Sequence, residues 1–216
     1  MPTRNLTRIL KAARYDIRNL VYPFLYPSYF LQGIFLFNGN RILRHPSARF
    51  EKDGGRVQFG CFWDLWRYRG GIVLHEHACL RTRGNVVIGD GVIIEVHAGA
   101  SLEIGPDTFI NPNSRILALE SIRIGADCAV AWDVQIMDGD RHFFVGPEGG
   151  RTRNTAAIHI DDHVWIGARS LILKGTRIEK GAVIGAGSVV SGHIAAGTLV
   201  AGNPAGEIRQ GVRWEK

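Results

Sequence analysis

One histidine stands in a setting that suits proton transfer: His142, the last residue of the run DGDRH. It lies at the start of a polar, glycine-rich stretch, residues 138–157, and two carboxylates precede it closely. An imidazole titrates near neutral pH, so it can remove a proton from a hydroxyl or an amine that attacks a carbonyl. Asp140 or Asp138 could orient this ring, or either could serve only the turn of the loop. We therefore expect a general base at His142 and a companion carboxylate at Asp140.

The other histidines carry weaker signals. His75 and His77 alternate along a strand and would share a face, but no further ligand follows at a useful spacing, so no metal site is predicted. His45 belongs to no motif, and the remaining four are expected on the surface in or beside the repeats: His97, His159, His163 and His193. A covalent acyl-enzyme is not expected either, because the sequence has no G-x-S-x-G elbow and Ser188 falls at a turn of the repeat.

A six-residue repeat predicts the elements that position these side chains. From residue 160 onward an aliphatic residue returns at every sixth position, and glycines mark the turns. The positions are Ile160, Ile166, Ile172, Ile178, Ile184 and Val190, and the same period runs upstream through Ile104, Ile110, Ile116 and Ile122. It restarts two residues later at Ile124 and is weaker from Leu74. Neither a helical nor a plain strand period fits this spacing.

Six residues make one short strand and one turn, and three such units close a triangular coil with its aliphatic side chains inside. Stacked coils bury one another's cores, so the sequence predicts an all-β fold, a parallel β-helix over residues 71–205. The loop at 138–157 is expected to interrupt the coils, and residues 206–216 to form a tail. The two-residue restarts are expected where one coil passes to the next, or at a bulged corner.

The segment from residue 158 to residue 209 resembles the carboxy-terminal half of the hexapeptide-repeat acyltransferases. The motifs VWIG, VIGAGSVV and AGNPA occur in that order, and the resemblance covers roughly residues 70–210. It is strongest to the galactoside, maltose and capsular or lipopolysaccharide O-acetyltransferases. This resemblance implies a left-handed β-helix, a homotrimer with active sites between neighbouring subunits, and acetyl-CoA as co-substrate. It also implies that His142 corresponds to the family's catalytic histidine.

The resemblance also implies where acetyl-CoA binds. The main chains of Ala168 and Ala186 would bind the pantetheine arm, Ser191 and Gly192 would contact the nucleotide end, and Arg209 would lie near the phosphates. Asn111 would donate a hydrogen bond to the thioester oxygen. Two departures, Gly206 and the run SGH at residues 191–193, replace basic or acidic residues that are common in the family. Some phosphate contacts are therefore expected to be lost, or to move to Arg177, Lys180 or the arginines of the loop.

Residues 1–70 are expected to form an appendage before the coils. An amphipathic helix over residues 4–21 carries arginines and a lysine on one face, and an aromatic segment broken by two prolines follows it. That segment is too short and too interrupted for a comfortable membrane span. The appendage could cap the open base of the β-helix, or residues 4–36 could lie on an anionic membrane surface. No signal-peptide pattern is recognised, so we expect a cytoplasmic protein that could work at the inner face of the membrane.

The overall charge narrows the class of ligand without naming it. The net charge is +6, which favours anionic ligands such as CoA or nucleotide-sugars. No motif that reads a nucleic-acid groove accompanies the charge, so nucleic-acid binding is not expected.

Three scattered cysteines, Cys61, Cys79 and Cys128, are expected to be reduced and buried.

The expected function is transfer of an acetyl group from acetyl-CoA to a sugar hydroxyl of a polysaccharide or glycoconjugate precursor. One alternative is N-acetylation of an amino-sugar nucleotide, although residues 1–70 lack the G-x-G-x-x-G of a nucleotide-binding domain. Another is a non-catalytic β-helix scaffold. A metal-dependent hydratase would need a histidine triad, and the spacing of His97, His159 and His163 does not match one.

Overall fold

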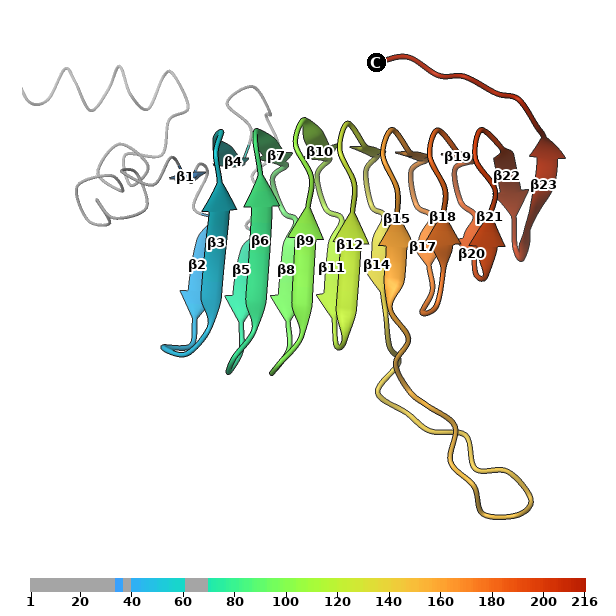
Figure 1. The fold of residues 1–216 in the computed structure, drawn as a ribbon, viewed down its shortest axis with the longest axis horizontal. Coiled ribbons are helices and arrows are strands. Elements are labelled where there is room, and N and C mark those ends of the chain that lie inside the picture. Colours follow the sequence, from blue (N-terminus) through green and yellow to red (C-terminus); the bar gives the residue numbers. More distant parts are fainter. Residues whose placement is uncertain (1–33, 37–39, 61–69) are drawn as a thin grey trace, which may run out of the picture.

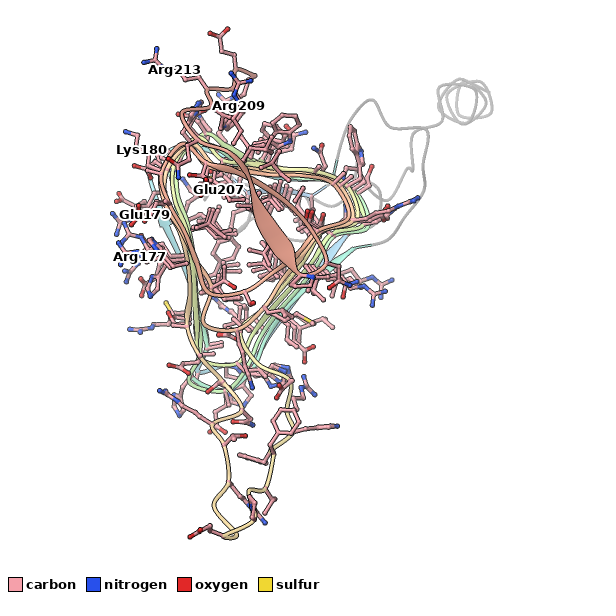
Figure 2. The ribbon with its side chains drawn as sticks, turned by 90° about the vertical axis from the view of Figure 1, so that its right-hand side faces the viewer. Arg177, Glu179, Lys180, Glu207, Arg209 and Arg213 are labelled. Atoms are coloured by element: carbon pink, nitrogen blue, oxygen red, sulfur yellow. The ribbon has the colours of Figure 1, made fainter. Side chains whose placement is uncertain are left out.

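The described residues form a column of short strands, stacked coil upon coil (Figure 1), and the column is triangular in section (Figure 2). The computed structural model describes residues 34–36, 40–60 and 70–216. Within these ranges all regular elements are strands, and consecutive strands pass in turn to three faces, here called A, B and C. Accordingly, the described part of the chain contains no helix long and apolar enough to cross a membrane.

The three faces are parallel sheets, apart from one antiparallel strand at the end of face A. Face A consists of β1 (Ile34–Leu36), β4 (Val57–Phe59), β7 (Val86–Ile88), β10 (Thr108–Ile110), β13 (Ala129–Val130), β16 (Trp165–Ile166), β19 (Val183–Ile184), β22 (Leu199–Gly202) and β23 (Ala205–Arg209). Face B consists of β2 (Arg41–Arg44), β5 (Gly71–Leu74), β8 (Ile93–Val96), β11 (Arg115–Ala118), β14 (Gln135–Met137), β17 (Leu171–Ile172) and β20 (Val189–Val190). Face C consists of β3 (Arg49–Asp53), β6 (Cys79–Arg83), β9 (Ser101–Ile104), β12 (Ser121–Ile124), β15 (Ile158–Ile160), β18 (Arg177–Ile178) and β21 (His193–Ile194).

The core is a ladder of aliphatic side chains from successive coils. On face B, Ile94 pairs with Ile72 on one side and with Ile116 on the other, so these early coils are longer than three six-residue repeats. Nearer the carboxyl end Ile172 pairs with Val190, and one coil there is three six-residue repeats long. All of these side chains are buried. The strict six-residue period therefore belongs to the shorter, later coils.

The longer coils explain the two-residue restarts in the sequence pattern. Strand β12 points both Ile122 and Ile124 into the core, and β7 does the same with Val86 and Ile88. When a strand has two inward-pointing residues, two positions apart, the six-residue repeat can be counted from either of them. The restarts are therefore a property of strand length, not of the passage between coils or of a bulged corner.

The column also begins earlier than the repeat predicted. Strands β2, β3 and β4, between residues 41 and 59, already belong to the three faces, and Ile42 pairs with Ile72 on face B. The coil from Ile42 to Ile72 is longer still, and its length hides the period from any six-residue count. The amphipathic helix expected over residues 4–21, with the membrane contact proposed for residues 4–36, falls almost entirely outside the described residues.

The loop of residues 138–157 leaves the column between β14 and β15, at the corner between faces B and C (Figure 1). Two antiparallel bridges, Gly139 with Thr155 and Val145 with Arg151, hold its two arms together. At the carboxyl end β23 pairs antiparallel with β22, and the tail then runs back along the column.

Candidate active site

Asp138 anchors the loop that carries His142. Its side chain is fully buried, and its carboxylate accepts the backbone N–H groups of Leu119 at 2.6 Å, Glu120 at 2.9 Å and Ser121 at 2.7 Å. Burial raises the pKa of this carboxyl, and the three backbone donors oppose that shift. Asp138 therefore attaches the loop to the preceding coil. Of the two roles expected for it, it stabilises the turn of the loop and does not orient the ring of His142.

Asp140 holds the backbone of the loop close to His142. One carboxylate oxygen accepts the backbone N–H of His142 at 3.3 Å, and the other accepts the Lys174 ammonium at 2.8 Å. Lys174 holds the pKa of the Asp140 carboxyl below its ordinary value. The imidazole of His142 is exposed and makes no hydrogen bond or ion pair with any residue that the structure describes. Asp140 thus contacts the main chain of His142 and not its ring.

The corner between faces A and B brings together three of the expected residues. Asn111, Ala168 and Ala186 follow β10, β16 and β19, so they lie in one column of turns. Within each coil the N–H of the first turn residue donates to the next coil, as Asn111 does to the carbonyl of Val130 at 2.9 Å. The N–H groups of Ala168 and Ala186, one position later, have no acceptor among the described residues. They are free to bind a ligand.

The remaining cofactor candidates lie at the other two corners. Ser191 and Gly192 are exposed between β20 and β21, on the B/C corner from which the loop also leaves. Arg209 ends β23, and Figure 2 shows it near Lys180 and Arg213, at the corner between faces C and A. One chain by itself therefore does not gather the expected acetyl-CoA contacts in a single place.

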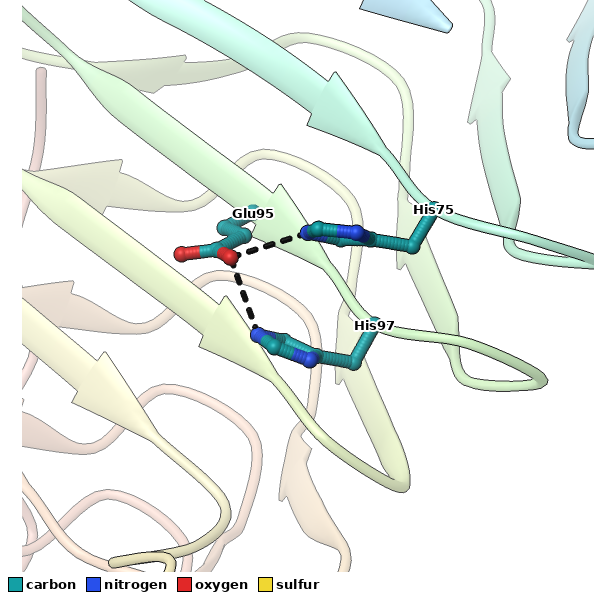
Figure 3. Close-up of side chains that lie close together, drawn as sticks. All are labelled: His75, Glu95 and His97. Atoms are coloured by element: carbon teal, nitrogen blue, oxygen red, sulfur yellow. Dashed lines mark hydrogen bonds and ion pairs between the residues drawn. The ribbon is translucent and has the colours of Figure 1, made fainter. Parts of the chain in front are cut away.

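Sequence reasoning missed a cluster of side chains at the B/C corner, made by His75, Glu95 and His97 (Figure 3). Nε2 of His75 lies 2.9 Å and Nε2 of His97 lies 3.0 Å from the same oxygen, Oε1 of Glu95. The two rings stack with their centroids 4.7 Å apart, and Arg141 of the loop contacts His97. This cluster meets the loop one residue before His142.

Two electrostatic effects operate inside this cluster. Burial acts to raise the pKa of the Glu95 carboxyl, but His75, His97 and Arg141 outweigh it, and the pKa lies below its ordinary value. Burial lowers the pKa of His97, with the Arg141 charge acting in the same direction and Glu95 against it. The cluster therefore favours a charged carboxylate beside a neutral imidazole.

Two further potential metal ligands lie beside His75, and the spacing of residues in the sequence did not reveal them. The exposed His77 has a left-handed backbone, φ 53°, and its ring lies 3.6 Å from Glu76. The partners of His75 come instead from the next coil, because β5 and β8 pair Leu74 with Val96 and so set His75 beside His97. The signal in the sequence was the spacing of His75 and His97, which equals the length of the coil from Ile72 to Ile94.

The histidines considered for a hydratase triad do not meet within the chain. His97 lies on the B/C corner, His159 lies on face C in β15, and His163 lies on the C/A corner. His163 is engaged elsewhere: its Nδ1 lies 2.6 Å from Asp127, and its ring stacks on Trp214 of the tail.

Comparison with known proteins agrees with this architecture. Residues 157–192 match the family described as bacterial transferase hexapeptide (six repeats). A protein of Escherichia coli (strain K12), assigned to lipopolysaccharide biosynthesis as the O-acetyl transferase WbbJ, is 29% identical over 168 residues, 69% of this chain and 86% of WbbJ. The chain therefore contains the hexapeptide repeat of this transferase family and is similar to an O-acetyltransferase over most of its length.

Two solved structures resemble this chain over most of its length. The polySia-specific acetyltransferase NeuO has a TM-score of 0.56 at 25% identity, with 82% of this chain and 85% of NeuO covered. The polysialic acid O-acetyltransferase OatWY has the same TM-score and identity, with 82% of this chain and 88% of OatWY covered. The likeness confirms the parallel β-helix expected from the repeat and the left hand implied by the family resemblance.

Proposed function

We propose that this protein moves an acetyl group from acetyl-CoA to a hydroxyl of a sugar in a polysaccharide or glycoconjugate precursor. The observation that carries the proposal is the position of His142, whose unengaged imidazole is held out on an anchored loop. The similarity to WbbJ, NeuO and OatWY, all acetyltransferases by name, supports both the reaction and the class of acceptor.

The transfer is direct in this proposal. The sugar oxygen attacks the thioester carbon while His142 takes the hydroxyl proton, and a tetrahedral oxyanion forms. The oxyanion then collapses, the carbon–sulfur bond breaks, and the proton passes to the CoA sulfur. No serine nucleophile is needed. Ser188 is buried, and its hydroxyl donates to the carbonyl of Gly185 at 2.6 Å as part of its turn.

The A/B corner suits the pantetheine arm of the donor. That arm carries amide carbonyls, and the free N–H groups of Ala168 and Ala186 are donors on adjacent coils. Their small side chains allow a ligand to approach the backbone. The amide of Asn111, two coils before Ala168 on the same corner, supplies a donor for the thioester oxygen.

A homotrimer completes the site in this proposal. Asn111, Ala168 and Ala186 occupy the A/B corner, whereas His142, Ser191 and Gly192 belong to the B/C corner. A second subunit whose B/C corner faces the A/B corner of the first would bring the base beside the thioester. Arg209 lies at the C/A corner, outside the two corners that this arrangement brings together.

The test measures thiol release from acetyl-CoA with a panel of sugars, nucleotide-sugars and oligosaccharides, for wild type and for His142→Ala. Loss of a general base lowers kcat by about 100-fold or more, while acetyl-CoA binding is retained. His159→Ala is the matched control, because His159 is exposed on face C, in the strand that follows the loop, and has no role in the proposed mechanism. Turnover that survives in His142→Ala would remove this residue from the mechanism. Hydroxylamine cleaves an ester product and leaves an amide intact, which separates O-transfer from N-transfer.

A further inference from the structure

We propose that His75, Glu95 and His97 form a binding site for one divalent transition-metal ion, zinc in the first place, on the B/C corner. The site goes beyond the proposed acetyl transfer, in which none of these three side chains takes part. It is made within one chain, by the ends of two adjacent strands of face B, β5 and β8 (Figure 3).

The three donor atoms are already near the positions that a metal ion needs. Nε2 of His75 and Nε2 of His97 lie 2.9 Å and 3.0 Å from Oε1 of Glu95, and all three atoms fall within 4.8 Å of one another. In a tetrahedral zinc site with bonds of about 2.0–2.1 Å, ligand atoms lie about 3.3 Å apart. Small side-chain rotations therefore suffice to admit the ion.

The backbone beneath the donors is rigid. The N–H of His75 donates to the carbonyl of Val96 at 3.0 Å, and the N–H of His97 donates to that of Ala118 at 2.8 Å. The same inter-coil ladder stacks the two rings 4.7 Å apart with an interplanar angle of 23°. An ion would thus meet ligands whose main chains are held before it arrives, which lowers the entropic cost of binding.

Without a metal ion, Nε2 of His97 cannot satisfy both of its neighbours by hydrogen bonding. Nε2 of His97 faces the guanidinium of Arg141, which can only donate, and the carboxylate of Glu95, which can only accept. With a proton, this nitrogen opposes the N–H of Arg141. Without one, its lone pair opposes the lone pairs of Glu95. A metal ion between the donors uses the lone pairs of both rings and of the carboxylate at once.

The donor set also selects the class of ion. Two imidazoles and one carboxylate suit zinc and its first-row neighbours, whereas calcium and magnesium prefer oxygen ligands alone. The side chains of His75, Glu95 and His97 are 40%, 33% and 24% exposed, so a fourth coordination position opens to solvent. A bound cation repels the guanidinium of Arg141, so occupancy of the site and the position of the loop beside His142 are linked.

The experiment titrates the full, untagged, chelator-stripped chain with Zn²⁺ in competition with a chromophoric chelator. We expect one ion per chain in wild type, and at least about 100-fold weaker binding in His97→Ala and Glu95→Gln. His77→Ala, an exposed histidine two residues from His75, is the matched control and should bind like wild type. Arg141→Ala should bind about fivefold more tightly, because a like charge has gone.

Co²⁺ gives a second readout that needs no activity. Four-coordinate Co²⁺ absorbs strongly in the visible range, and this band should form in wild type and in His77→Ala but not in His97→Ala. Circular dichroism of each stripped variant checks that the β-helix has formed. Absence of stoichiometric Zn²⁺ in wild type, or equal binding by wild type, folded His97→Ala and folded Glu95→Gln, would overturn the proposal.

Discussion

Asp138 and Asp140 lie two residues apart in one loop, yet their surroundings give them different tasks. Asp138 is buried and accepts three backbone N–H groups of the preceding coil, whereas Asp140 is exposed and bonds Lys174 and the backbone of His142. Asp138 holds the start of the loop against the column, and Asp140 holds the backbone beside His142. Sequence spacing cannot separate such roles, because both carboxylates precede the histidine by a similar distance.

Replacing Asp138 should cost much more stability than replacing Asp140. In Asp138→Ala three buried or half-buried backbone donors lose their acceptor, so we expect the free energy of unfolding to fall by about 3 kcal/mol. Asp140→Ala removes a surface ion pair and one exposed hydrogen bond to the backbone of His142, and should cost less than about 1 kcal/mol. Thermal denaturation compares the two variants, and hydrogen exchange at residues 119–121 reports the local loss. Equal melting temperatures would show that the carboxylate of Asp138 does not anchor the loop.

At the scale of the element, the A/B corner repeats one backbone conformation from coil to coil. Its third residue has a left-handed φ in each case: Gly91 (72°), Asn113 (64°), Asp133 (58°), Arg169 (61°) and Gly187 (72°). From Asn113 onward, the N–H of this residue donates back to the preceding coil, as Gly187 does to the carbonyl of Ala168 at 2.8 Å. The left-handed turn therefore closes the inter-coil ladder at this corner.

Gly187→Ala should destabilise the fold by about 1 kcal/mol, because a side chain at φ 72° is strained even though it would meet no atom within 4 Å. Gly206→Ala is the matched control: a Cβ there also meets nothing within 4 Å, and its φ is not left-handed. Its melting temperature should stay within error of wild type. A Gly187→Ala protein that melts with the control would contradict the strain argument.

At the scale of the whole molecule, the tail turns back and docks on the C/A corner. Trp214 stacks on His163 with centroids 4.2 Å apart, and its indole N–H donates to the carbonyl of His163 at 2.9 Å. Lys216 and His163 both contact the carboxylate of Asp127, at 2.6 Å each. Residues from two adjacent coils and from the last residues of the sequence thus share one polar contact.

Acid should release this tail before it disrupts the coils. Lys216 and then His163 hold the pKa of Asp127 below its ordinary value of 3.8, so its contribution to docking is present above that pH and is lost as the pH falls through the lowered pKa. The indole N–H resonance of Trp214 should then move to the position of a solvent-exposed indole, while the β-sheet dichroism persists. In Asp127→Asn this step should be absent. A tail that stays docked in wild type under acid would contradict the assignment.

The sequence by itself determined the class of fold, since the regularly repeated aliphatic positions are the residues that enter the core. It also indicated the loop of residues 138–157, because polar, glycine-rich residues interrupt that repeat there, and it identified His142 as a candidate base. It failed for the first coils, where the longer steps from Ile42 to Ile72 and from Ile72 to Ile94 replaced the short period.

Only the tertiary structure decided which polar residues meet. Stacking sets residues one coil apart side by side, so His75 gains His97 and Glu95 as neighbours rather than the nearby His77. It likewise gathered Asn111, Ala168 and Ala186 on one corner and left His142 on another. The period of the sequence says which side chains point inward. The coil length and the register between coils decide what lies beside those that point outward, and a pattern of core residues does not encode that pairing.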